Sequence, residues 1–147
     1  MAQPVSKIRQ ILVPLNGDPT DRDAIDLACR LAKAAKAHIF AVYVIEVKRT
    51  LPLDAEIPPE IDRGDAVLRM AEDWAGEYGL EIETELLQAR EPGPALVDEA
   101  MERGVDLIML GLAYKTHLGD FDPGKTASYL LRKAPCRVWV LRGPIPA

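Results

Sequence analysis

The first candidate for chemistry in this chain is the stretch GDFDPGKTA, residues 119–127. Its residues Gly119, Gly124, Lys125 and Thr126 have the spacing GxxxxGK(S/T) of a P-loop, which binds nucleotide phosphates through backbone N–H groups and a lysine. One hypothesis is therefore a slow NTPase that uses Lys125 and Thr126 of the stretch 119–126.

The sequence around this stretch argues against a P-loop. A P-loop joins a strand directly to a helix, whereas Gly119 lies eight residues beyond Gly111, where an apolar strand-like run ends. Asp120 and Asp122 would bring negative charge to a polyanion, and Pro123 lacks an N–H to offer it. We therefore expect the match to be accidental.

The other reactive side chains do not form a catalytic or metal-binding set. His38 and His117 have no second His or Cys at ligand spacing, so we expect no metal site. Cys29 and Cys136 are far apart and are expected to be buried, unreactive thiols. We identify no catalytic residues and expect no enzyme.

Charged side chains gather in two other places. Three acidic residues suit the positive end of a helix dipole: Asp21, Asp23 and Asp26. Basic residues that form either a small anion-attracting patch or a solvated face are Lys115, Lys125, Arg132 and Lys133.

Length and charge limit the possible classes of function. A chain of 147 residues suits one domain, 1–147, that folds without disulfides or metal. The formal net charge of −5 disfavours nucleic acid as a partner, because duplex binding depends on a basic face. No apolar run reaches the roughly 20 residues of a membrane span, and the N-terminus lacks a secretory signal. We expect a cytoplasmic protein without membrane insertion.

Apolar runs of strand length alternate with segments of helical period along the chain. The expected strands are 7–15, 38–46, 80–88, 105–111 and 136–142, and the expected helices are 19–37, about 61–78, 92–103 and 125–133. Thr20 or Asp21 is the expected N-cap of the first helix. This order predicts an α/β fold, a Rossmann-like doubly wound parallel sheet of five strands with helices on both faces.

The third expected strand differs from the others because Glu81, Glu83 and Glu85 alternate with less polar residues. Such alternation is typical of an edge strand with one wet face, and it predicts the strand order 3-2-1-4-5. Ligands bind such sheets at the carboxyl ends of the strands, where the order reverses. The loops concerned are 14–19 and 111–125.

Three segments resemble the universal stress protein family: ILVPLNGD near the N-terminus, VDLIMLG at 105–111 and ASYLLRKAPCRVWVLR at 127–142. The resemblance runs from Ile8 to Arg142 and implies a regulatory role in the stress response. Nucleotide-binding members carry G-x2-G-x9-G(S/T) after the fourth strand and an Asp after the Pro that follows the first strand. The resemblance thus implies ATP or another adenine nucleotide, with Mg²⁺, as a ligand.

This chain keeps part of that motif. Gly111 and Gly124 match the first and third glycines, whereas Tyr114 replaces the second. Lys125 occupies the hydroxyl position, and Asn16 stands where those members have the Asp. The residues that the resemblance places against an adenine nucleotide are Pro14, Asn16, Val44, Leu110, Gly111, Tyr114, Gly124, Lys125 and Thr126.

Two interpretations of this region stay open. Tyr114, Asp120 and Asp122 disfavour the triphosphate pose of the family, whereas Lys125 at a helix start offers a positive charge to a phosphate. The chain is then either a nucleotide-binding regulatory domain or a dimeric interaction module whose pocket Tyr114 closes. The long loop 47–60 is either a lid or a passive connection.

The last expected strand contains four successive apolar residues: Val138, Trp139, Val140 and Leu141. At a sheet edge such a strand invites pairing with another chain, and the resemblance implies dimers formed through it. We therefore expect a symmetric homodimer that presents a surface to a protein partner, which the sequence does not identify.

Overall fold

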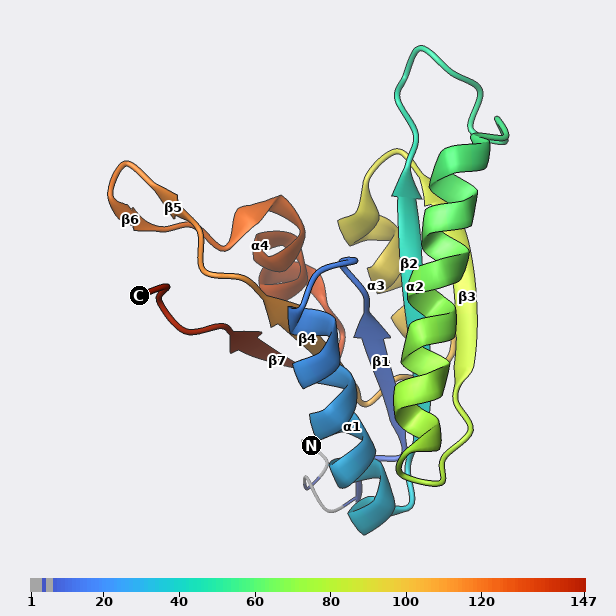
Figure 1. Cartoon of the computed structure of the whole chain (residues 1–147), viewed down its shortest axis with the longest axis vertical. Coiled ribbons are helices and arrows are strands. Elements are labelled where there is room, and N and C mark those ends of the chain that lie inside the picture. Colours follow the sequence, from blue (N-terminus) through green and yellow to red (C-terminus); the bar gives the residue numbers. More distant parts are fainter. Residues whose placement is uncertain (1–3, 5–6) are drawn as a thin grey trace.

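Five parallel strands form one sheet in the order β3-β2-β1-β4-β7 (Figure 1). They are β1 (Gln10–Pro14), β2 (His38–Glu46), β3 (Glu83–Ala89), β4 (Leu107–Leu112) and β7 (Arg137–Arg142). This computed structural model describes residue 4 and residues 7–147. Because β7 is the fifth strand of the sheet along the chain, the predicted α/β fold and strand order are confirmed.

Four helices cover the two faces of the sheet. They are α1 (Thr20–Ala35), α2 (Pro58–Gly76), α3 (Pro92–Glu102) and α4 (Gly124–Lys133). Buried residues of α1 and α2 share one core cluster, and those of α3 and α4 share another. In β1, Ile11 and Val13 belong to the first cluster and Leu12 to the second, and all three are fully buried. A central strand covered on both faces must be apolar where it is buried, which explains the apolar residues 11–14 after Gln10.

The start of α1 differs from the prediction, because neither Thr20 nor Asp21 is its N-cap. Thr20 is the first helical residue, and the cap residue is Pro19. The Asp18 carboxylate accepts hydrogen bonds from the backbone N–H of Thr20, at 2.9 Å, and from the Thr20 hydroxyl. The side chain of Asp21 turns back to the preceding loop instead.

A second, two-stranded sheet was not predicted. The strands β5 (Thr116–His117) and β6 (Asp120–Phe121) form an antiparallel hairpin between β4 and α4. The hairpin projects from the body of the molecule, on the side of β7 (Figure 1).

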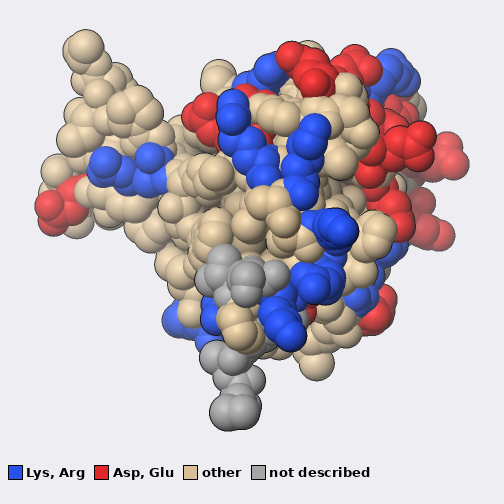
Figure 2. All heavy atoms as spheres, turned by 90° about the horizontal axis from the view of Figure 1, so that it is seen from below, with Lys and Arg blue, Asp and Glu red and all other residues tan. Residues whose placement is uncertain are grey.

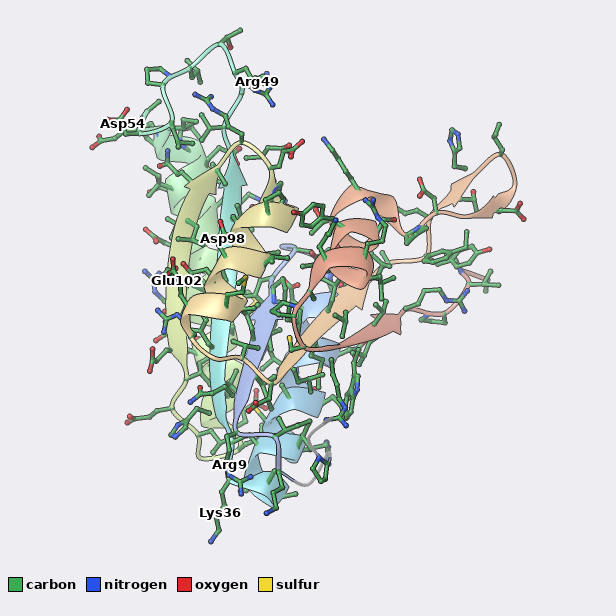
Figure 3. The ribbon with its side chains drawn as sticks, turned by 180° about the vertical axis from the view of Figure 1, so that it is seen from behind. Arg9, Lys36, Arg49, Asp54, Asp98 and Glu102 are labelled. Carbon is green, nitrogen blue, oxygen red and sulfur yellow. The ribbon has the colours of Figure 1, made fainter. Side chains whose placement is uncertain are left out.

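Basic side chains gather at the end of the molecule where the central strands begin (Figure 2). Arg9 and Lys36 lie at this end (Figure 3), and Arg9 Nη1 donates a hydrogen bond of 3.2 Å to the carbonyl of Ala35, the last residue of α1. Helix carboxyl ends carry partial negative charge, which basic side chains neutralise. Within the described residues, every helix is too short or too polar to cross a bilayer.

Candidate functional site

A pocket of about 200 Å³ lies at the carboxyl ends of β1, β2 and β4, where the strand order reverses. The chain contributes Pro14 and Asn16 from the end of β1, Val44 from β2, Leu110 from β4 and Thr126 from α4. These are five of the nine residues predicted to contact a nucleotide. Strands far apart in sequence bring them together because parallel strands end at the same edge of the sheet.

The walls of this pocket are mainly strand side chains, with polar groups from Asn16 and Thr126. Apolar walls with a few placed polar groups are typical of sites that bind small organic molecules. The volume is below the roughly 300–1,000 Å³ common for drug-sized ligands. The pocket therefore suits a heterocyclic base better than a whole nucleoside triphosphate.

A second hollow of about 210 Å³ adjoins the first, and the two share Pro92 and Thr126. Lys125 and Arg132 line it, so it is the more cationic of the two. The Lys125 Nζ lies 3.7 Å from a carboxylate oxygen of Glu91, and the Lys125 side chain is 78% exposed. Because an exposed pair at this distance contributes little, Lys125 is available to an anion.

Asn16 joins three segments at the edge of the pocket. Its Nδ2 donates to the carbonyl oxygen of Gly111 at 2.6 Å and lies 3.4 Å from the Thr20 hydroxyl oxygen. These contacts use the amide nitrogen, which leaves the amide oxygen as an acceptor for a ligand. An ionised Asp, which the nucleotide-binding members carry here, could not donate the same bond to a carbonyl oxygen. The replacement of Asp by Asn is visible in the sequence, but this hydrogen bond is not, because the partner of Asn16 is a main-chain group 95 residues away.

Glycine is favoured at positions 111 and 124 for two different structural reasons. A Cβ on Gly111 would lie 2.5 Å from the backbone oxygen of Thr20, so only glycine lets β4 approach α1 this closely. Gly124 has φ of +79° and open space where a side chain would project, so its backbone conformation is what favours glycine. Neither glycine lines the pocket; Gly111 follows its lining residue Leu110, and Gly124 precedes Lys125, which lines the second hollow described above.

Tyr114 packs at the base of the hairpin, outside the set of residues that line the pocket. Its ring stacks on Phe121 with centroids 5.5 Å apart and planes at 22°. The Arg142 guanidinium lies 4.9 Å from the Tyr114 ring centroid and 5.5 Å from that of Phe121. The GxxxxGKT stretch accordingly begins in a hairpin turn at Gly119 rather than in a loop wrapped around phosphates.

Asp21 is a buried carboxylate beside the loop after β1, and the sequence suggested for it only the helix dipole or the N-cap of α1. Only 3% of the residue is exposed, and its two oxygens accept the backbone N–H groups of Asn16 at 2.7 Å and Gly17 at 2.8 Å. Burial raises the pKa of Asp21 from 3.8 to about 6, although these hydrogen bonds oppose the shift. Asp21 therefore holds the loop that presents Asn16. The run NGDPTD, in which acids follow a turn, was the available signal.

The loop after β2 is tied to the end of β3 by two side chains. Arg90 Nη1 donates to the carbonyls of Lys48 at 2.6 Å and Leu51 at 2.7 Å. Gln88 Nε2 donates to the carbonyls of Leu53 at 2.9 Å and Ala55 at 2.8 Å. The loop is thus an anchored connection, and its residues Arg49 and Asp54 lie at one extreme of the molecule (Figure 3).

The remaining candidates are dispersed. His38 and His117 are exposed, on β2 and on the hairpin. Burial raises the pKa of Cys29 to about 11 and also raises that of Cys136. Among residues 4 and 7–147, no three His, Cys, Asp or Glu side chains are grouped so that they could hold a metal ion.

Known proteins share this arrangement. The model of the universal stress protein family matches residues 7–142. A universal stress protein of Methanocaldococcus jannaschii is 30% identical over 142 residues, which cover 92% of this chain and 83% of that protein.

Solved structures agree at the level of the fold. A universal stress protein in complex with cAMP has a TM-score of 0.72 at 22% identity, covering 92% of this chain and 98% of that one. The Archaeoglobus fulgidus universal stress protein in complex with dAMP has a TM-score of 0.74 at 19% identity, covering 91% of this chain and 98% of that one. With its family match, its sheet order and its switch-point pocket, the chain belongs to the universal stress protein family.

Proposed function

We propose that this protein is a regulatory domain that binds an adenine mononucleotide, without turnover, in the pocket between β1, β2 and β4. The observation that carries the proposal is the convergence of Pro14, Asn16, Val44, Leu110 and Thr126 on one mainly apolar pocket at the switch point. Two proteins of the same fold are complexes with cAMP and dAMP, which supports this class of ligand.

The two adjoining hollows suggest how such a ligand would lie. The adenine would occupy the pocket of about 200 Å³, where the Asn16 oxygen accepts a hydrogen bond from its exocyclic amine. The phosphate would extend past Thr126 toward Lys125 and Arg132. Charge-assisted contacts from a lysine and an arginine are well suited to a phosphate.

The hairpin favours a monophosphate over ATP. In this chain residues 116–121 form a projecting hairpin, so they do not enclose a polyphosphate. The hairpin also carries Asp120, and Asp122 follows it. We accordingly expect AMP or a cyclic monophosphate to bind more tightly than ATP, with no requirement for Mg²⁺.

Thermal unfolding at fixed protein concentration tests the ligand. AMP, cAMP, adenosine and ATP with and without Mg²⁺ are each added at millimolar concentration. A ligand at 100 times its Kd adds about 2.7 kcal/mol to the free energy of unfolding, which raises Tm by roughly 5–10 °C for a chain of this size. No shift with any of them would reject the proposal and leave the dimeric interaction module as the function.

Lys125→Ala tests the phosphate position. We expect it to weaken AMP binding about fivefold, equivalent to about 1 kcal/mol, because one charge-assisted contact is lost. Adenosine binding should not change. Lys133→Ala is the matched control, since Lys133 is also an exposed lysine of α4 but lies at the other end of the helix. Equal effects of the two variants would contradict the assignment.

We also propose a cytoplasmic homodimer paired through β7. This strand is at the edge of the sheet, and Val138, Trp139, Val140 and Leu141 are all partly exposed. A charge in the middle of an edge strand opposes strand pairing, so Val140→Lys should shift the protein toward monomer in sedimentation velocity. Unchanged sedimentation would contradict pairing through this strand.

A further inference from the structure

The hairpin ends in an exposed apolar side chain on an unfavourable backbone. Leu118 is 91% exposed, more than any other large hydrophobic side chain that the structure describes. Leu118 and Gly119 form the turn between β5 and β6, with φ of +53° and +85°. A turn with two positive φ values is of type I′, for which Asn-Gly or Gly-Gly is the usual sequence.

Leucine is poorly suited to this position within a single copy of the chain. Its Cβ disfavours the left-handed region, and its side chain gains almost no burial there. Asparagine at position 118 would tolerate both the left-handed backbone conformation and the exposure to solvent better than leucine does. A leucine that is unfavourable in backbone and in exposure is explained if a partner buries it.

Defined contacts hold the hairpin at its base. Tyr114 and Phe121 stack at its base, and Arg142 lies against both rings. The backbone N–H of Asp122 donates to the carbonyl of Lys115 at 2.8 Å, which closes the base. Because Arg142 is the last residue of β7, the hairpin is attached to the open edge of the sheet.

The direction in which the hairpin projects favours a second copy of this chain as the partner of Leu118. In two opposite views it extends on the side of β7, away from β3 (Figures 1 and 3). The segment after β7 also lies on this side and exposes Ile145, at 63%. A second copy paired along β7 would therefore lie next to the hairpin, and two-fold symmetry would give each copy the same contact.

We propose that the hairpin of residues 116–121 is a dimer arm, and that Leu118 of each copy is buried against a second copy of this chain. The inference rests on the proposed pairing through β7 and adds a second contact to it. It is independent of nucleotide binding.

The substitution Leu118→Asn separates the two roles of this residue. Asn-Gly favours the type I′ turn, so the hairpin of the isolated copy is retained, while the apolar contact with the second copy is lost. We expect the dissociation constant of the dimer, measured by sedimentation velocity over a dilution series, to rise at least tenfold. Under dilute, monomeric conditions Tm should stay equal or increase. The matched control is Leu53→Asn, an exposed leucine on the loop after β2, which should leave the dimer unchanged.

The outcomes are distinguishable. A wild-type dimer that Val140→Lys dissociates, and that Leu118→Asn leaves unchanged, overturns the arm and retains pairing through β7. A wild-type protein that stays monomeric at all concentrations overturns both. An equal loss of dimer in Leu118→Asn and Leu53→Asn also overturns the arm, because the effect is then not specific to the hairpin.

Discussion

The amide of Asn16 connects the end of β1 to the end of β4 and the start of α1. Its nitrogen donates to the Gly111 carbonyl, an acceptor that no carboxylate can satisfy. We predict that Asn16→Asp lowers the free energy of unfolding at pH 7 by roughly 1–3 kcal/mol, because a buried acceptor loses its donor and faces a negative charge. Urea unfolding measures this, with Asn16→Ala as the comparison that removes the bonds without adding charge. An aspartate variant at least as stable as wild type would show that the amide bond is unimportant.

Asp21 makes stability depend on pH, at the level of one carboxyl group. Its pKa in the folded protein, about 6, is above its ordinary value of 3.8, so the folded state binds this proton more tightly than the unfolded state. The corresponding stabilisation is fully present below about pH 4 and is lost as the pH rises through 6, by at most about 3 kcal/mol. We predict that Asp21→Asn removes this decrease from the pH profile of the free energy of unfolding, measured in urea from pH 4 to 7.

The control for Asp21 is Asp23→Asn, an exposed acid in the same turn of α1. It should leave the decrease between pH 4 and 6 in place. A profile of Asp21→Asn parallel to that of wild type would assign the pH dependence to other groups.

At the scale of elements, Arg103 connects the end of α3 to the edge strand β3 through ion pairs. Its guanidinium contacts Glu83 at 3.0 Å, Glu85 at 3.3 Å and Glu99 at 3.2 Å. It also lies 3.5 Å from the ring centroid of Phe40 on β2. Burial, and then the charge of Glu99, raise the pKa of Glu85, while Arg103 opposes this shift.

We predict that Arg103→Ala lowers the free energy of unfolding by roughly 1–3 kcal/mol, because three ion pairs and a cation–π contact are lost and the glutamates then repel each other. Arg103→Lys should recover part of the loss, since it restores charge but not the planar fork. Lys125→Ala, which breaks one loose pair, is expected to change stability by less than about 0.5 kcal/mol. Urea unfolding of the three variants checks the order. Equal losses in the free energy of unfolding for Arg103→Ala and Lys125→Ala would contradict a stabilising role of Arg103 between α3 and β3.

The main elements could be predicted from sequence because four strands of this sheet are largely apolar runs, the edge strand β3 alternates acidic with less polar residues, and each helix has an amphipathic period. The pocket residues Pro14, Val44 and Leu110 followed from the family resemblance and from the common edge of parallel strands. The hairpin could not be predicted, since its strands have two residues each and its turn is Leu-Gly instead of Asn-Gly. The run NGDPTD indicates an acid near a turn, but it does not identify the partners of Asp21, which are main-chain N–H groups whose positions depend on the path of the loop.

At the scale of the whole molecule, stability is expected to be uneven. Ile11, Leu12, Leu107 and Ile108, on the paired central strands β1 and β4, are fully buried. We predict that amides of β1 and β4 exchange with solvent only on global unfolding, and that those of 116–121 exchange several orders of magnitude faster in dilute solution. Hydrogen exchange read by mass spectrometry measures both. Comparable protection of the hairpin and the central strands in the monomer would contradict this gradient.

Charge is also unevenly distributed over the molecule. The net charge is −5, yet Lys and Arg gather at the end where the central strands begin (Figure 2). Lys33 lies in the last turn of α1, and Lys133 in that of α4. These residues match the negative ends of the helices, so the basic end is explained by the fold itself. The phosphate proposed for the pocket would lie toward the opposite edge of the sheet, where Lys125 at the start of α4 supplies positive charge.

The anchored loop after β2 has a consequence for the kinetics of ligand exchange. Arg90 and Gln88 hold its carbonyl groups to the end of β3, so we expect that this loop does not swing aside before a molecule enters. Occupancy of the pocket should then follow the concentration of free ligand in a single step, with an observed rate that increases linearly and does not level off. The occupancy of such a domain would at each moment reflect the present concentration of the proposed nucleotide and would not depend on earlier concentrations.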